Sequence, residues 1–152
     1  MAFNLLNKIL TALFFITTIA INANGQDLKN NNLIVIGNKI GTNTLTSSEL
    51  IDVFKGEKAF WNNKKNVIVV IPNNKHKNVE LISKLIYNTS VMGMQKFWLQ
   101  LVFQGRSNPP QNFENDIDMI NFVKNNAGAI AIVDVKYKND IEEEYQILIN
   151  NK

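Results

Sequence analysis

Two loops of the chain combine hydroxyl, amide and cationic side chains at the expected starts of helices, a pattern suited to holding a small anion. The first loop follows a short apolar run and carries Asn38, Thr42, Thr44, Ser47 and Ser48. The second, at residues 73–78, carries Asn74 and Lys75. First-turn amides have no partner inside a helix and lie at the positive end of its dipole, so such loops favour anions. A structural interpretation stays open for both loops, because the hydroxyls can cap a helix or close turns and the second loop can be solvated.

A third candidate is Arg106, the only arginine among the 16 Lys and Arg residues of the chain. A guanidinium can hold a planar oxyanion with two donors, which a lysine cannot do. Arg106 can equally contact a protein partner, or the C-terminal end of a helix, where a cation is stabilising. These three interpretations stay open at this stage.

Catalytic and metal-binding chemistry lacks its usual residues. The chain has no cysteine, which excludes disulfides, thiolate nucleophiles and thiolate zinc sites. His76 is the single histidine and has no partner ligand, and the acidic run 142–144 lacks the alternating spacing of calcium ligands. We therefore expect no enzyme activity, no metal and no cofactor.

Length and composition fit one globular domain. The chain has 152 residues, of which 45% are hydrophobic and 19% charged, which is typical of a folded domain of this size. The formal net charge of +3 is too small to indicate a nucleic-acid partner.

The first 25 residues have the pattern of a secretory signal peptide. Lys8 precedes an apolar stretch at 9–21, and Ala23 and Gly25 occupy the small-residue positions of a cleavage site. The stretch is short for a membrane span, although a membrane anchor or a buried helix are the alternatives. We expect cleavage after Gly25, no stable membrane span afterwards, and a periplasmic or secreted protein. Residues 26–32 are expected to be a flexible lead-in to a single domain at 33–150.

Apolar runs and helical periodicities alternate along this domain. Runs at 33–36, 67–71, 129–133 and 145–149 predict buried strands. Helices are expected over 46–56, where Thr46 and Glu49 form a capping box, over 78–86, over 89–105 and over 113–126. The order β-α-β-α-α-α-β-β predicts an α/β fold, a single three-layer lobe with a mostly parallel sheet.

Three segments, in the same order along the chain, resemble periplasmic phosphate-binding proteins of ABC transporters. The resemblance is strongest to the small, single-lobe relatives of these proteins. The three segments are Thr46-x-x-Glu49-Leu50-x-x-x-Phe54-x-Gly56-x-x-x-x-Trp61, Phe97-Trp98-x-x-x-Val102-Phe103-x-Gly105-Arg106-x-x-Pro109-Pro110, and Gly128-Ala129-Ile130-Ala131. The resemblance implies a lobe of the type II periplasmic-binding-protein fold. In full-length relatives two such lobes close on an oxyanion, which loops and helix N-termini hold through amides and hydroxyls, often with an arginine.

The chain departs from that pattern in three ways. The Ser-Gly-Thr phosphate cradle is missing, and residues 73–77 occupy its approximate place. Ala131 stands where the late strand of the family usually has a second glycine. The length predicts one lobe, where full-length relatives have two.

Two functions follow as hypotheses. The first is an extracytoplasmic solute-binding module for phosphate or a similar small oxyanion, linked to envelope transport. One lobe that supplies half of the contacts would contribute about −4 kcal/mol, near millimolar affinity, unless a homodimer or an envelope protein completes the site. The alternative is a non-catalytic accessory protein of an envelope transporter or sensor that has lost tight ligand binding. A binding module should bring Thr44, Ser47, Lys75 and Arg106 around one hollow.

Overall fold

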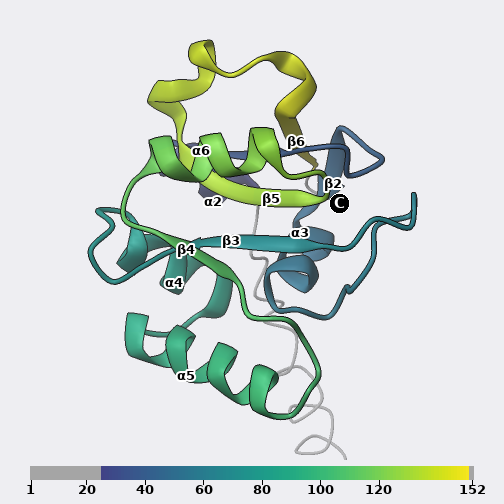
Figure 1. Ribbon diagram of the computed structural model, residues 1–152. Helices are drawn as coiled ribbons and strands as arrows, with labels where there is room; N and C mark the ends of the chain where they lie inside the picture. Colours follow the sequence, from purple (N-terminus) through teal and green to yellow (C-terminus); the bar gives the residue numbers. More distant parts are fainter. Residues whose placement is uncertain (1–24, 151–152) are drawn as a thin grey trace, which may run out of the picture.

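The computed structural model describes residues 25–150, which form a six-stranded mixed sheet with helices on both faces (Figure 1). The predicted signal peptide falls on residues 1–25, so apart from Gly25 that prediction lies outside the described residues. None of the described helices is both long enough and apolar enough to cross a bilayer.

The sheet has the strand order β2-β6-β1-β5-β3-β4. Its strands are β1 (Leu33–Gly37), β2 (Thr44–Thr46), β3 (Ile68–Pro72), β4 (Gln111–Phe113), β5 (Ala129–Asp134) and β6 (Gln146–Asn150). Three neighbouring pairs are parallel, namely β2–β6, β3–β5 and β3–β4. β1 runs antiparallel to both β5 and β6. The predicted α/β fold with a mostly parallel sheet is confirmed.

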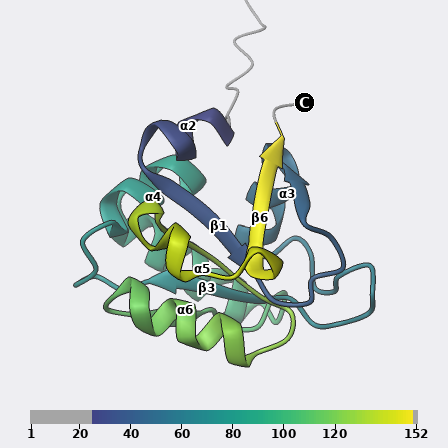
Figure 2. The same ribbon diagram turned by 90° about the horizontal axis from the view of Figure 1, so that it is seen from above.

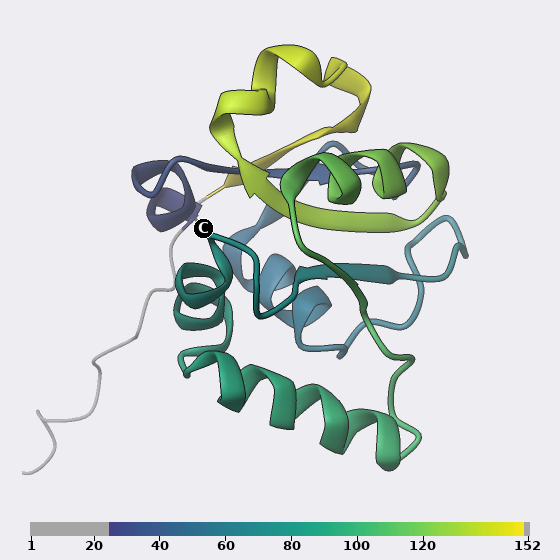
Figure 3. The same ribbon diagram turned by 60° about the vertical axis from the view of Figure 1, so that its left-hand side comes forward.

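Helices cover the two faces of this sheet unequally. One face packs against α2 (Gly25–Asn30), α3 (Ser47–Phe54), α4 (Val79–Tyr87) and α5 (Val91–Phe103). The other packs against α6 (Asp116–Asn125) and two short 3-10 helices, η1 (Val135–Asp140) and η2 (Glu143–Tyr145). Figure 3 shows α4 and α5 on one side of β3 and α6 on the other. This arrangement gives the three layers that the alternating strands and helices predict.

The alternating side chains of the strands divide the core in two. On β3, Val69 and Ile71 face the α3–α4–α5 layer, and Val70 faces Met119 and Val123 of α6. All of these side chains are buried. Both faces of the central strands are therefore apolar, which explains why their sequences read as continuous hydrophobic runs.

Residues 26–32 are the clearest correction to the expected organisation. They contain most of α2, which leads into β1 (Figure 2), and Leu28 is buried in the core. The polar, Asn-rich composition suggested a flexible lead-in, but one apolar side chain packed against the sheet is enough to dock this short helix. The helix expected from residue 113 begins instead at Asp116, because Gln111–Phe113 pair with β3 as β4.

Candidate functional site

The eight predicted site residues do not gather around one hollow. Thr44 lies on β2 at one edge of the sheet, and Lys75 follows β3, four strands away. At about 4.8 Å per strand, this separation is about 19 Å. Arg106 lies at a third place, in the loop after α5. Each group therefore has to be considered by itself.

In the first loop, most polar groups are used inside the fold. Asn38 is buried, and its side-chain amide donates to the carbonyls of Val123 and Lys124, both at 2.9 Å, at the C-terminal end of α6. The hydroxyl of Thr42 donates to the Thr44 carbonyl and accepts from the Thr44 amide. Thr46 and Glu49 form the predicted capping box of α3.

The hydroxyls nearest the start of α3 offer less than the pattern suggested. Thr44 donates its hydroxyl to the Asn43 side chain at 3.2 Å. Ser47 is half-buried and Ser48 exposed, at the first two positions of α3. Because Thr46 already caps this helix, the loop has the structural role that the capping pattern allowed.

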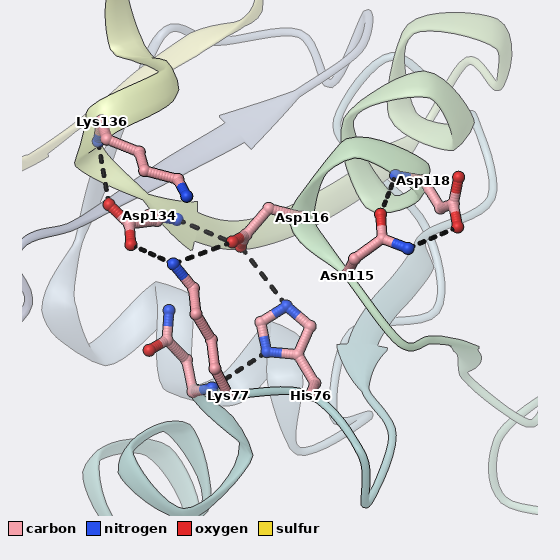
Figure 4. Close-up of polar contacts among 8 residues, drawn as sticks. His76, Lys77, Asn115, Asp116, Asp118, Asp134 and Lys136 are labelled. Carbon is pink, nitrogen blue, oxygen red and sulfur yellow. Dashed lines mark hydrogen bonds and ion pairs between the residues drawn. The ribbon is translucent and has the colours of Figure 1, made fainter.

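The second loop, residues 73–78, lies beyond the carboxyl ends of β3, β4 and β5 (Figure 4). Asn74 is exposed, and Lys75 forms an ion pair with Glu114 at 2.7 Å. The Asn73 side chain fixes the loop by accepting from the Lys75 amide at 2.9 Å. In open α/β sheets, ligands bind at this edge, outside the carboxyl ends of the strands.

A charge cluster joins Lys77 of this loop to Asp134 and to the buried carboxylate of Asp116. Lys77 pairs with Asp134 at the end of β5, and its Nζ lies 3.6 Å from Asp116 Oδ2. Asp116 is only 2% exposed and accepts from the Asp134 amide at 3.2 Å. The cluster ties the end of β5, the first turn of α6 and the start of α4 together.

His76 completes the cluster from the interior. Its side chain is fully buried, and Nδ1 accepts from the Asn78 amide at 3.0 Å. A neutral imidazole therefore carries its proton on Nε2, which lies 3.4 Å from Asp116 Oδ1, longer than a normal hydrogen bond. The only histidine of the chain thus contacts the start of α4 and the first turn of α6 from the interior.

The groups of the cluster shift one another's pKa values. Burial raises the pKa of Asp116, but the contacts with His76, the Asp134 amide and Lys77 outweigh it, so this pKa lies below its usual value. Hydrogen bonds from Lys77 and from the Lys136 amide lower the pKa of Asp134. The hydrogen bond with Asp134 in turn raises the pKa of Lys77. All three groups are therefore charged near neutral pH.

The start of α4 differs from the starts of the other long helices. α3, α5 and α6 have side-chain caps from Thr46, Ser90 and Asn115, whereas Asn78 makes no side-chain cap on α4. Among the described residues, no hydrogen bond involves the amides of Glu80 or Leu81 as donors. Lys75 and Lys77 precede this end of α4 in the chain, and their ammonium groups contact Glu114, Asp116 and Asp134.

Sequence reasoning missed the acidic half of this cluster. Asp116 and Asp134 lie about 40 and 60 residues after the loop in the chain, and only the parallel pairing of β3 with β5 brings them to it. A weak signal was present, because Asp134 ends an apolar strand and Asp116 opens a helix. Residues 25–150 contain no group of three or more His, Cys, Asp or Glu side chains placed to hold a metal ion.

Arg106 follows the C-terminal end of α5. Its amide donates to the Leu101 carbonyl and the Gly105 amide to the Val102 carbonyl, the pattern of a Schellman motif. Gly105 has φ +66, the conformation that this motif requires. The Arg106 side chain is exposed, and it forms no ion pair within residues 25–150.

Comparison with known proteins supports the fold. No family model and no curated protein matches the sequence. The structure is similar to PstS from Borrelia burgdorferi, with a TM-score of 0.60 and 14% identity over 78% of this chain and 47% of that one. It is also similar to a possible phosphate binding protein from Planctomyces limnophilus, with a TM-score of 0.54 and 12% identity over 79% and 42% of the two chains.

The chain thus spans less than half the length of these two solved structures. Their similarity confirms, at the level of the fold, the resemblance that the three sequence segments indicated. The described domain therefore has the fold of one part of a periplasmic phosphate-binding protein.

Proposed function

We propose that the protein is an extracytoplasmic solute-binding module that holds a phosphate-like oxyanion at the N-terminus of α4, as part of envelope transport. The observation that carries the proposal is the first turn of α4, which has no side-chain cap and two amides, those of Glu80 and Leu81, without an acceptor among residues 25–150. This turn directly follows Lys75 and Lys77 in the chain and lies beyond the carboxyl ends of three strands. Free amides at a helix N-terminus and nearby ammonium groups are the donors that an oxyanion requires. The family resemblance implies the same place for the phosphate cradle.

The affinity of this half-site should be low. Two amides and one or two lysines supply about half of the contacts of a closed site, which corresponds to about −4 kcal/mol and a Kd near 1 mM. Lys75 can turn to a ligand at little cost, because its ion pair with Glu114 is exposed on both sides and water and salt screen such pairs strongly. A tighter site would need a second surface, from a homodimer or an envelope protein.

Thermal unfolding at low salt tests the proposal with phosphate, sulfate and chloride at equal ionic strength. At about 10 mM, phosphate with a Kd near 1 mM should stabilise the fold by about 1.4 kcal/mol. Lys75→Gln should reduce this stabilisation, and Glu114→Gln, which releases Lys75, should increase it. Lys138→Gln on η1, an exposed lysine far along the chain, is the control. Equal effects of phosphate and chloride would contradict the proposal.

A second function, a non-catalytic accessory protein of an envelope transporter or sensor, is favoured by one observation. Lys77 already faces two carboxylates of the chain itself, Asp116 and Asp134. A cradle neutralised in this way can keep its shape without an external anion. This function predicts no selective stabilisation by phosphate in either the native protein or the Glu114→Gln variant.

A further inference from the structure

A large groove lies at the opposite end of β3 from the loop 73–78. It has a volume of about 800 Å³, and we call it the Arg106 groove after the residue that lies at its rim. The segment Lys58–Phe60 forms one side, where the Ala59 carbonyl accepts from the Val67 amide. The loop after α5, residues 105–109, forms the other side. Figure 1 shows both segments at the end of the molecule where β3 begins.

The topology leaves this groove open. β4 begins to pair with β3 only at Val70, through Gln111, so the β4 side of residues 67–69 has no strand partner from β4. Phe122 of α6 contributes from the other layer. The groove is within the size range of small-molecule sites, about 300–1,000 Å³.

The charges along the groove have one sign. Its lining includes Lys58 and Arg106 and contains no Asp or Glu. Lys58 lies over the Trp61 ring at 5.4 Å, and neither cation forms an ion pair within the described residues. Elsewhere in the fold, Lys75, Lys77 and Lys124 are all paired with carboxylates.

The C-terminal ends of two nearby helices do not neutralise these two cations. α3 and α5 both finish at the groove, and each ends in a Schellman motif, at Gly56 and Gly105, whose amides bond the free carbonyls. Each helix end still carries a partial charge of about −0.5. The two full positive charges exceed the two partial negative charges, although part of the field of Lys58 acts on the nearby carboxylate of Glu49.

The same groove presents aromatic surface. The side chain of Phe60 is 59% exposed, and Phe122 and Val102 line the interior with it. Asn66, Asn108 and Gln111 add amide groups that can orient a ligand. An inorganic ion would leave the aromatic rings unused, whereas an anion with an apolar body would contact both.

We propose that the Arg106 groove binds a small organic anion, a carboxylate or phosphate monoester attached to an aromatic or aliphatic body. The guanidinium of Arg106 would take two oxygens of the anionic group, and Lys58 would add a second positive charge. Phe60 would cover the apolar body by stacking. This site is separate from the proposed oxyanion site at α4, so each can fail without the other.

The test is a titration of the ¹⁵N-labelled protein, followed by NMR, with phenyl phosphate as the probe. Benzyl alcohol and inorganic phosphate serve as the uncharged and the non-aromatic comparison. The amides of Phe60, Gly105 and Gln111 report on the groove, and those of Glu80 and Leu81 report on α4. We expect saturable shifts at the groove amides, with phenyl phosphate binding about tenfold or more tightly than benzyl alcohol.

Variants identify the groups responsible. Arg106→Gln should weaken phenyl phosphate about tenfold, and Arg106→Lys should recover part of that loss because it restores the charge alone. Phe60→Ala should remove the advantage of phenyl phosphate over inorganic phosphate. Lys96→Gln, an exposed lysine of α5 outside the groove, should change nothing. The side chains of Arg106, Phe60 and Lys96 are all exposed, so the amide spectrum should show that each variant keeps the fold.

Two results would overturn the proposal. One is the absence of saturable shifts at the groove amides up to about 10 mM phenyl phosphate, where even a millimolar site would be mostly filled. The other is binding that the neutral probe reproduces, or that Arg106→Gln leaves unchanged, because the groove would then select no anion.

Discussion

The buried carboxylate of Asp116 should be one of the most important polar groups for stability. Replacing it with alanine removes the acceptor of the Asp134 amide and the group that faces the buried Nε2 of His76. The hydrogen bond from the Asp134 amide to this charged acceptor contributes about 1.5–3 kcal/mol, and leaving that amide unpaired costs about 1–3 kcal/mol. Because Lys77 is half-exposed and can return to water, we expect a net loss of about 3 kcal/mol.

Urea unfolding followed by the fluorescence of Trp61 and Trp98, both buried, measures this loss. With an m-value of about 1–3 kcal/mol/M, Asp116→Ala should lower the midpoint by about 1–3 M. Asp118→Ala is the matched control, because Asp118 is an exposed carboxylate in the same first turn of α6. Its loss should stay below about 1 kcal/mol.

The pH dependence supplies a second check. The folded-state pKa of Asp116 lies below its unfolded value, so its stabilisation is complete above the unfolded value of about 3.9 and is lost as pH falls through the folded value. The difference between the native protein and Asp116→Asn should therefore be constant from pH 7 to about pH 5 and shrink below about pH 4. Equal midpoints for Asp116→Ala and Asp118→Ala at pH 7 would refute this reasoning.

Three further predictions use the same unfolding assay. Tyr87→Phe should lower the free energy of unfolding by about 2–4 kcal/mol, because it removes the donor to the Phe54 carbonyl and the acceptor of the Trp98 indole. The control is Tyr145→Phe, at a half-buried position. Burial raises the pKa of Tyr87, so the native protein should lose stability above about pH 10, where the unfolded chain ionises first, and Tyr87→Phe should lose less. Gly128→Ala should lower the free energy of unfolding by about 2 kcal/mol or more beyond the loss for Gly105→Ala. Both glycines have positive φ, but a Cβ at Gly128 would lie 2.2 Å from the carbonyl oxygen of Asn66, whereas a Cβ at Gly105 would meet nothing. Asn38→Ala should lower the free energy of unfolding by about 2–3 kcal/mol, because it leaves two carbonyls of α6 without their donor. The control is Asn63→Ala at an exposed position, which should cost less than about 1 kcal/mol. Similar losses for the two variants would contradict the structural role of Asn38.

The elements that could be predicted are those whose sequence alone carries the signal. β1, β3, β5 and β6 are apolar runs buried on at least one face, and the capping box at Thr46 marks the start of α3 within one residue. β2 and β4 have three residues each, and they exist because β6 and β3 offer them an edge. No local pattern encodes such an edge. The antiparallel direction of β1 is equally a property of the whole sheet.

The site was predictable only in part for the same reason. Asn74 and Lys75 could be assigned to a loop before a helix, because the loop and the helix are neighbours in the chain. Asp116, the carboxylate that faces His76 and Lys77, comes from another helix, and its approach depends on strand order. Asn38 was placed correctly after β1, but its two bonds to α6 depend on a contact across 85 residues.

The central claim, an oxyanion at the N-terminus of α4, is tested most directly by following the amide signals of Glu80 and Leu81 during a titration with inorganic phosphate. Chloride at equal ionic strength provides the reference, and the amides of Ser47 and Ser48 report on the first loop. The account predicts saturable shifts at Glu80, Leu81 and Lys75 with a Kd near 1 mM, absent with chloride. Shifts that are identical for phosphate and chloride, or that appear at Ser47 and Ser48 instead, would contradict it.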